Sequence, residues 1–121
     1  MDYLSYKVLH ILGLLLVFTA VGGMTLHTLN GGDRDSNRAR KLVGISHGVG
    51  LVILLVSGFG MIAKLQLGFP AWIWVKVAIW LFFGAVTVVI RRLAGTAAAL
   101  WFILPLIGTV AAYLAIFKPG A

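Results

Sequence analysis

The sequence predicts an all-α fold: an antiparallel bundle of four helices that spans a membrane. Three observations predict it. Of the 121 residues, 61% are hydrophobic, most of them lie in four long runs, and only short polar connections separate the runs. A soluble domain is usually about 45–50% apolar, and a small domain cannot bury such an excess. A spanning helix needs roughly 20 apolar residues, so four spans fill residues 1–121 as a single domain.

The four spans are expected at about residues 3–29, 39–65, 71–90 and 96–117. The first ends in the turn at residues 30–33, where glycine supplies a helix stop. The second ends at residues 68–70, because Pro70 suits the first turn of the next helix. Short connections between consecutive spans favour an up-down-up-down bundle.

The ends of the later spans carry residues typical of membrane boundaries. Phe69, Trp72 and Trp74 gather at the start of the third span, as in an interfacial aromatic belt. Basic residues close the third span, and a lysine closes the fourth. These features predict where each helix leaves the apolar slab.

The distribution of basic residues predicts the orientation. The first and third connections hold six of them, against three at span ends on the other side. The rule that basic loops stay in the cytoplasm then places both termini outward, in a bacterial inner membrane. The six are Arg34, Arg38, Arg40, Lys41, Arg91 and Arg92, and the three are Lys7, Lys64 and Lys118.

Charge and cysteine content exclude several function classes. The net charge is +7, but the basic residues flank apolar runs, so they indicate contact with anionic lipid rather than with nucleic acid. The chain has no cysteine, which excludes disulfides, thiolate metal sites and cysteine nucleophiles. Serines and threonines within the spans, such as Ser57, are expected to bond back to helix carbonyls. No serine–histidine–acid set is available in the membrane, so the chain is not expected to be a hydrolase.

Four polar residues within the spans are candidates for a binding site, and their depth predicts two levels. A helix rises about 1.5 Å per residue, which places His10 and Lys76 at one level near the outer side. His27 and His47 fall within roughly 6 Å of one another in depth near the inner side. If the first two spans are antiparallel neighbours, His27 and His47 could therefore bind one ligand between them.

Imidazoles on neighbouring spans are typical of b-type haem, with one histidine on each side of the iron. His10 and His47 are the candidate metal ligands, and His27 is a further candidate cofactor residue. Glycines near these histidines could let a flat ring approach. The alternative is that the glycines are helix contacts, and that the histidines bond across helices or, for His27, reach the interface.

Lys76 is unusual because the acidic residues, Asp2, Asp33 and Asp35, all lie outside the expected spans. A charged amine at the bilayer centre costs at least about 2.5 kcal/mol, so Lys76 must snorkel, lose its proton or meet an anion. Beside His10, it could instead line a small polar pocket for a carbonyl, a haem propionate or a quinone oxygen.

Several short motifs resemble the SirB-like family of small four-span membrane proteins. They are residues 6–10 (YKVLH), the pair Ser46-His47, residues 72–76 (WIWVK), the basic pair at 91–92 and residues 117–119 (FKP). The family typically has Pro-His and a nearby aspartate in the second span, whereas this chain has Ser46 and no acid there. The resemblance implies that His10, His47 and Lys76 are stronger candidates for site residues than His27.

Two functions follow as hypotheses. The first is a non-catalytic subunit that packs into a larger respiratory or other energy-converting membrane complex, or that self-associates. The second is a redox bundle that binds haem b or a quinone through His10, His47 and Lys76. A pore built by oligomerisation is a third possibility, but the spans have few polar positions to line one.

Overall fold

The computed structural model describes residues 1–119, and it confirms the predicted all-α bundle, since the long elements of this part of the chain are helices. The helices are α1 (Tyr3–Leu29), α2 (Arg40–Leu65), α3 (Ala71–Arg92) and α4 (Ala97–Phe117), and a 3₁₀ turn at Ala94–Thr96 leads into α4. Each of the four is long and apolar enough to cross a membrane. The chain is therefore an integral membrane protein of four helices.

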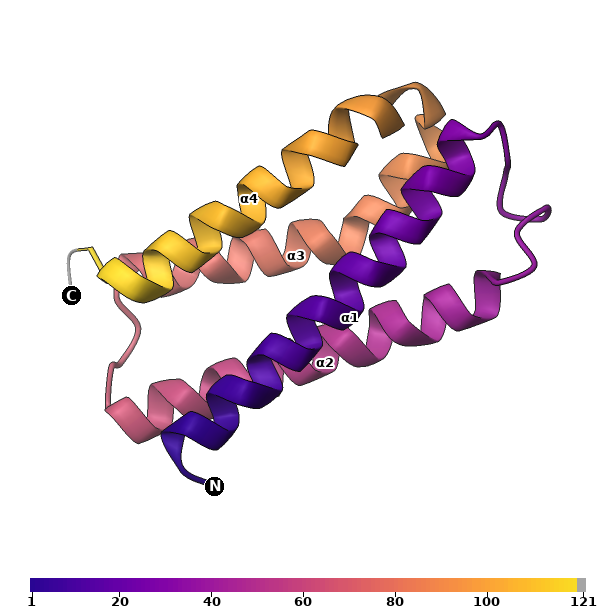
Figure 1. The fold of residues 1–121 in the computed structure, drawn as a ribbon. Coiled ribbons are helices and arrows are strands. Elements are labelled where there is room, and N and C mark those ends of the chain that lie inside the picture. Colours follow the sequence, from indigo (N-terminus) through magenta and orange to yellow (C-terminus); the bar gives the residue numbers. More distant parts are fainter. Residues whose placement is uncertain (120–121) are drawn as a thin grey trace.

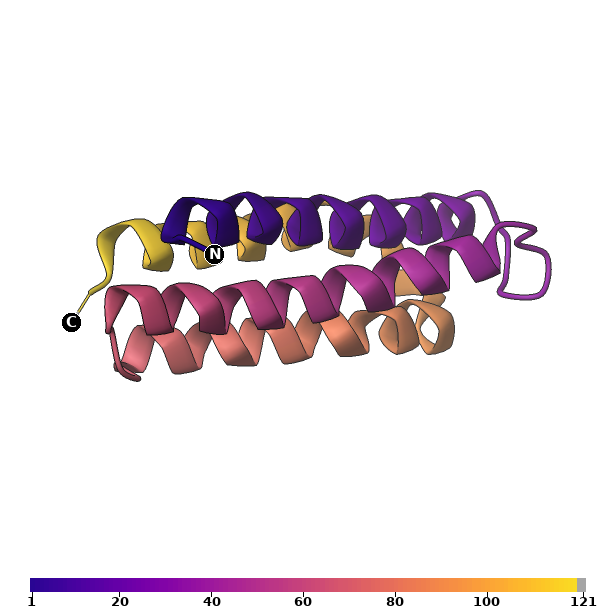
Figure 2. The ribbon, with the colours of Figure 1, turned by 90° about the horizontal axis from the view of Figure 1, so that it is seen from below.

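The helices run antiparallel to their neighbours in the chain (Figure 1). The α1–α2 loop and the α3–α4 turn lie at one end of the bundle, which we call the loop end. The α2–α3 connection and both termini lie at the other, the terminal end. Seen after a 90° turn, α1 and α4 lie along one side of the bundle, and α2 and α3 along the other (Figure 2).

Local chemistry explains where the helices begin and end. The Asp2 carboxylate accepts a hydrogen bond of 2.8 Å from the Ser5 backbone N–H, which caps α1. After α1, Gly31 has a φ of +83°, a left-handed conformation that glycine adopts without steric cost. Gly68, with a φ of +65°, performs the same role between α2 and α3.

Helices α1 and α2 approach one another closely where two glycines meet. A Cβ atom on Gly13 would lie 2.9 Å from the Gly50 carbonyl oxygen and 3.0 Å from the Leu54 backbone nitrogen. A Cβ atom on Gly50 would lie 2.8 Å from a methyl carbon of Val17 and 2.9 Å from the Gly13 carbonyl oxygen. Small residues at such crossings allow the backbones of membrane helices to pack by van der Waals contact.

A hydrophobic core joins α1, α3 and α4. Its buried members are Val17, Val21, Phe83, Val86, Ile90, Leu100 and Leu104. The rings of Phe18 and Phe83 pack at a centroid distance of 5.1 Å. The face of α3 that carries Phe83, Val86 and Ile90 therefore points into the bundle, which fixes the direction of the other residues on that face.

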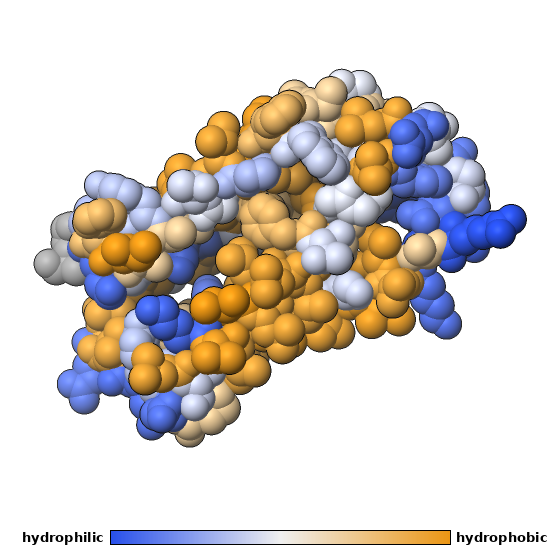
Figure 3. Space-filling view, viewed as in Figure 1, coloured by the Kyte–Doolittle hydropathy of each residue, from blue (hydrophilic) through white to orange (hydrophobic). Residues whose placement is uncertain are grey.

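Apolar side chains cover much of the outer surface, as lipid contact requires. Phe102 on α4 is 71% exposed, whereas Val86 in the core is 0% exposed. Hydrophobic atoms dominate the middle of the surface, and hydrophilic atoms gather toward the ends (Figure 3). This pattern matches a bilayer around the middle of the helices and water or headgroups at the ends.

Candidate functional site

His10 on α1 reaches across to α2. Its Nδ1 atom lies 2.9 Å from the Ser57 hydroxyl oxygen. The ring also packs beside Gly58, where an added Cβ atom would lie 3.5 Å from the imidazole Cε1. Ser57 itself is 1% exposed, so this contact lies in the interior of the α1–α2 pair.

The hydroxyl of Ser57 determines which ring nitrogen of His10 carries a proton. Ser57 donates its single hydrogen to the Ile53 carbonyl oxygen at 2.6 Å, the bond back to the helix that the sequence predicts. The hydroxyl oxygen therefore accepts a hydrogen bond from the Nδ1–H of His10. The neutral ring then keeps a lone pair on Nε2, which is free to accept a proton donor or to bind a metal.

Lys76 lies on the inward face of α3. It follows the buried Trp72 by one helical turn, and Trp80, one turn further on, donates from its indole nitrogen to the Leu51 carbonyl oxygen at 2.9 Å. The Lys76 side chain is half-buried. It lies one turn from Trp80 toward the end of α2 where Ser57 contacts His10. The structure thus places at the same end of the bundle the two residues that the depth argument placed at one level.

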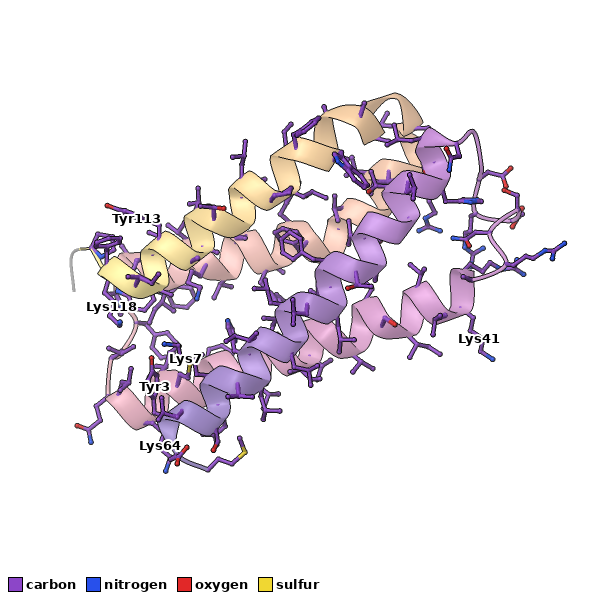
Figure 4. All side chains as sticks on the ribbon, viewed as in Figure 1. Tyr3, Lys7, Lys41, Lys64, Tyr113 and Lys118 are labelled. Atoms are coloured by element: carbon purple, nitrogen blue, oxygen red, sulfur yellow. The ribbon has the colours of Figure 1, made fainter. Side chains whose placement is uncertain are left out.

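The terminal end around this pair is rich in lysine. Lys7, Lys64 and Lys118 lie at this end, while Lys41 lies at the opposite one (Figure 4). The surface is hollowed between the C-terminal end of α4 and the N-terminal end of α1 (Figure 3). No ion pair within residues 1–119 neutralises these amines at a distance of 4.0 Å or less.

The aromatic residues at the start of α3 divide between two environments. Trp74 is 58% exposed and Phe69 is 53% exposed, as expected of an interfacial belt. Trp72 is only 6% exposed, and its indole N–H is buried without a hydrogen-bond partner in the described part of the chain. Placing Trp72 in the belt was therefore wrong, because its side chain packs on the same inward face as Lys76.

His47 is buried at the interface of α2 and α3. Its Nε2 atom lies 2.8 Å from the Phe83 carbonyl oxygen. A carbonyl only accepts hydrogen bonds, so Nε2 carries the hydrogen and donates it. This contact is one of the cross-helix bonds that the sequence left open as the alternative to a cofactor role.

His27 is held by the loop that follows α1. Its Nε2 atom lies 2.8 Å from the Asp33 carbonyl oxygen, to which it donates, and Gly32 lies against the ring. The Asp33 carboxylate accepts a hydrogen bond from the Ser36 backbone N–H, which holds the pKa of Asp33 below its ordinary value. His27 therefore organises the connection between α1 and α2.

His27 and His47 line one cavity at the loop end, so the pairing expected from their depth is also found in the structure. The cavity has a volume of about 450 Å³ and is bordered by α1, the α1–α2 loop, α2 and α3. Three arginines are among its lining residues, namely Arg34, Arg40 and Arg91. We call this cavity the arginine cavity.

His10 and His47 are not brought together. His10 contacts Ser57, and Ser57 is ten residues from His47 along α2, a distance of about 15 Å along the helix axis. Two imidazoles so far apart are not placed on opposite sides of one iron. No cluster of three or more histidine, aspartate or glutamate side chains that could hold a metal ion occurs within residues 1–119.

Most glycines that the sequence suggested for ring approach have other surroundings. Nothing lies within 4 Å of a Cβ atom built on Gly22, Gly23, Gly44 or Gly48. Gly32 lies beside the His27 imidazole and Gly58 beside that of His10, and Gly58 was not predicted because it is far from every histidine in the sequence. The carbonyl partner of His47 was missed for the same reason, since Phe83 carries no polar side chain.

Comparison with known proteins adds no assignment. No family model, no curated protein and no solved structure matches this chain. The resemblance to the SirB-like family therefore stays a hypothesis, and the function has to be argued from the site.

Proposed function

We propose that this integral membrane protein binds the headgroup of a membrane-soluble quinone between His10 and Lys76. One observation carries the proposal: a half-buried lysine on an inward helix face lies at the same end of the bundle as a histidine whose Nε2 lone pair is free. Lys76 can donate to a quinone carbonyl oxygen, and His10 can accept from the hydroxyl of the reduced quinol. A protein that sits in the bilayer meets such a ligand directly from the lipid.

Two further features support a carbonyl-bearing ligand. The buried indole N–H of Trp72 lies one helical turn before Lys76, and a buried donor without a partner is costly. The spans contain no carboxylate that could satisfy Lys76 instead. A ligand oxygen at this position would satisfy donors that the chain alone leaves open.

The experiment is a titration of the purified protein in phosphatidylcholine nanodiscs with a short-chain benzoquinone, followed by quenching of tryptophan fluorescence. We expect saturable binding that Lys76→Met weakens about tenfold or more, because a hydrogen bond to a charged group contributes about 1.5–3 kcal/mol. Lys64→Met is the matched control, since it removes an exposed amine at the same end of the bundle. Binding by Lys64→Met should equal that of the wild type.

Equal affinity of the wild type and Lys76→Met for the quinone would refute the proposal. A Soret absorption band in the purified protein that disappears in His10→Leu would instead identify haem as the ligand of His10. Circular dichroism of each variant verifies that the helices are intact before the affinities are compared.

A subunit role in a larger assembly is the second candidate, and one observation favours it. Gly44 and Gly48 lie four residues apart on α2, both are exposed, and no atom lies within 4 Å of a Cβ atom built on either. This spacing of small residues is typical of surfaces against which another membrane helix packs. The partner would be a further transmembrane helix, from another copy or from another subunit.

The second candidate predicts an assembly that depends on Gly48. Blue-native electrophoresis of membranes solubilised in mild detergent should give a species larger than the monomer. We expect Gly48→Leu to shift the protein to the monomer position, because the leucine side chain keeps the partner helix away. Val49→Leu, at an exposed position next in the chain, should leave the larger species intact. A monomer for the wild type, or the same shift in both variants, contradicts this role.

A further inference from the structure

We infer that the arginine cavity at the loop end binds the phosphate group of an anionic phospholipid. This site lies at the end of the bundle opposite to the His10–Lys76 site and does not depend on the quinone proposal. Its volume of about 450 Å³ falls within the range of about 300–1,000 Å³ that is usual for ligand sites.

The charge of the cavity favours an anion. Arg34 comes from the α1–α2 loop, Arg40 from the start of α2 and Arg91 from the end of α3, so three separate elements each contribute an arginine to the lining. Guanidinium groups match the oxygens of a phosphate in a bidentate geometry. In residues 1–119 no carboxylate lies within ion-pair distance of these arginines.

The other polar groups of the cavity leave this preference in place. Asp33 and Asp35 also border it, but one carboxylate oxygen of Asp33 is engaged by the Ser36 backbone N–H. Arg40 donates to the Asp35 carbonyl oxygen at 3.3 Å, which is a bond to the backbone and not an ion pair. His27 donates to the loop, and His47 to α3. The lining holds three arginines against two aspartates, a net formal charge of +1, which still favours an anion.

The position of the cavity identifies the source of the phosphate as lipid. It lies where three helices end, which is the depth of the headgroups around a protein that spans the bilayer. Ile90 and Met24 give it apolar walls, and the exposed Gly44 lies at its border on α2. Basic cavities between transmembrane helices at this depth are suited to anionic headgroups.

The chain offers a matched pair of variants for the test. Both Arg91 and its neighbour Arg92 are exposed, but only Arg91 lines the cavity. Removal of either charge changes the net charge of the loop end equally. A difference between Arg91→Gln and Arg92→Gln therefore reports the cavity and not the general attraction of a basic surface.

Native mass spectrometry of the protein in a neutral detergent measures the binding directly, with phosphatidylglycerol as the probe, phosphatidylcholine as the zwitterionic comparison and inorganic phosphate as a competitor. We expect phosphatidylglycerol to be retained over phosphatidylcholine, Arg91→Gln to weaken its binding about tenfold, and Arg92→Gln to change it less than twofold. Equal losses in both variants, or equal retention of the two lipids, would overturn the inference. Displacement of phosphatidylglycerol by millimolar phosphate would overturn the assignment to lipid.

A triple variant extends the comparison. Arg34→Gln, Arg40→Gln and Arg91→Gln together should abolish the preference for phosphatidylglycerol. The control with Arg38→Gln, Lys41→Gln and Arg92→Gln removes the same charge from exposed positions outside the cavity and should keep it. Loss of the preference in both triple variants would contradict the inference. Circular dichroism identifies any triple variant that fails to fold. In that case the comparison of Arg91→Gln with Arg92→Gln tests the inference.

Discussion

Gly13→Ala will destabilise the bundle, although alanine is ordinarily the better helix former. In an open helical position, replacement of glycine by alanine gains up to about 1 kcal/mol. At Gly13 the new methyl group would lie 2.9 Å from the Gly50 carbonyl oxygen and 3.0 Å from the Leu54 nitrogen. Both atoms belong to the backbone of α2 and cannot move aside as a side chain would. We expect a net loss of about 1–3 kcal/mol, the usual cost of overpacking.

Gly22→Ala is the control, because Gly22 lies in the same helix and nothing lies within 4 Å of its added Cβ atom. It should leave the stability unchanged or raise it. Reversible unfolding in mixed micelles of mild detergent and dodecyl sulfate, followed by circular dichroism, gives both free energies. The close approach of α1 and α2 would be refuted by a Gly13→Ala protein that is as stable as Gly22→Ala.

Phe83→Ala will cause a larger loss of stability. Phe83 is 6% exposed, belongs to the core of α1, α3 and α4, and packs against the ring of Phe18. Truncation of a buried phenylalanine costs about 3–5 kcal/mol in soluble proteins. We expect about 3 kcal/mol here, because lipid solvates the unfolded apolar surface, and the loss comes mainly from the contacts around the cavity.

Phe102→Ala provides the comparison for Phe83→Ala. Phe102 is 71% exposed on α4, where it contacts lipid rather than the core. Its truncation should change the free energy of unfolding by less than about 0.5 kcal/mol, as at other exposed sites. The same unfolding titration measures both variants. Equal losses would mean that the core does not lie where the structure places it.

Hydrophobic runs and helix stops made the fold predictable. Lipid imposes a minimum length on each span, and the turns at residues 30–33 and 68–70 separate the runs. The observed helices begin and end within two residues of the expected ranges. The Gly13–Gly50 approach was not predictable in the same way, because fifteen glycines occur in the chain and packing alone decides which of them meet.

The candidate sites were predictable in depth but not in rotation. A constant rise per residue was enough to place Lys76 and His10 toward one end of the bundle, and His27 and His47 toward the other. It could not reveal that His47 faces the Phe83 carbonyl or that Trp72 faces inward. Which face of a helix meets its neighbour depends on side-chain packing across the bundle, and a run that is apolar all round carries little record of it.

The glycine contact between α1 and α2 also bears on how the chain is assembled. It joins α1 and α2, which leave the ribosome before α3 and α4, so it does not require the later helices. A hairpin of these helices can settle in the bilayer while the rest of the chain is in the translocation machinery. The α3–α4 hairpin then packs against a pair of helices that has already formed. His10 therefore contacts Ser57 before α3 brings Lys76 into the bundle.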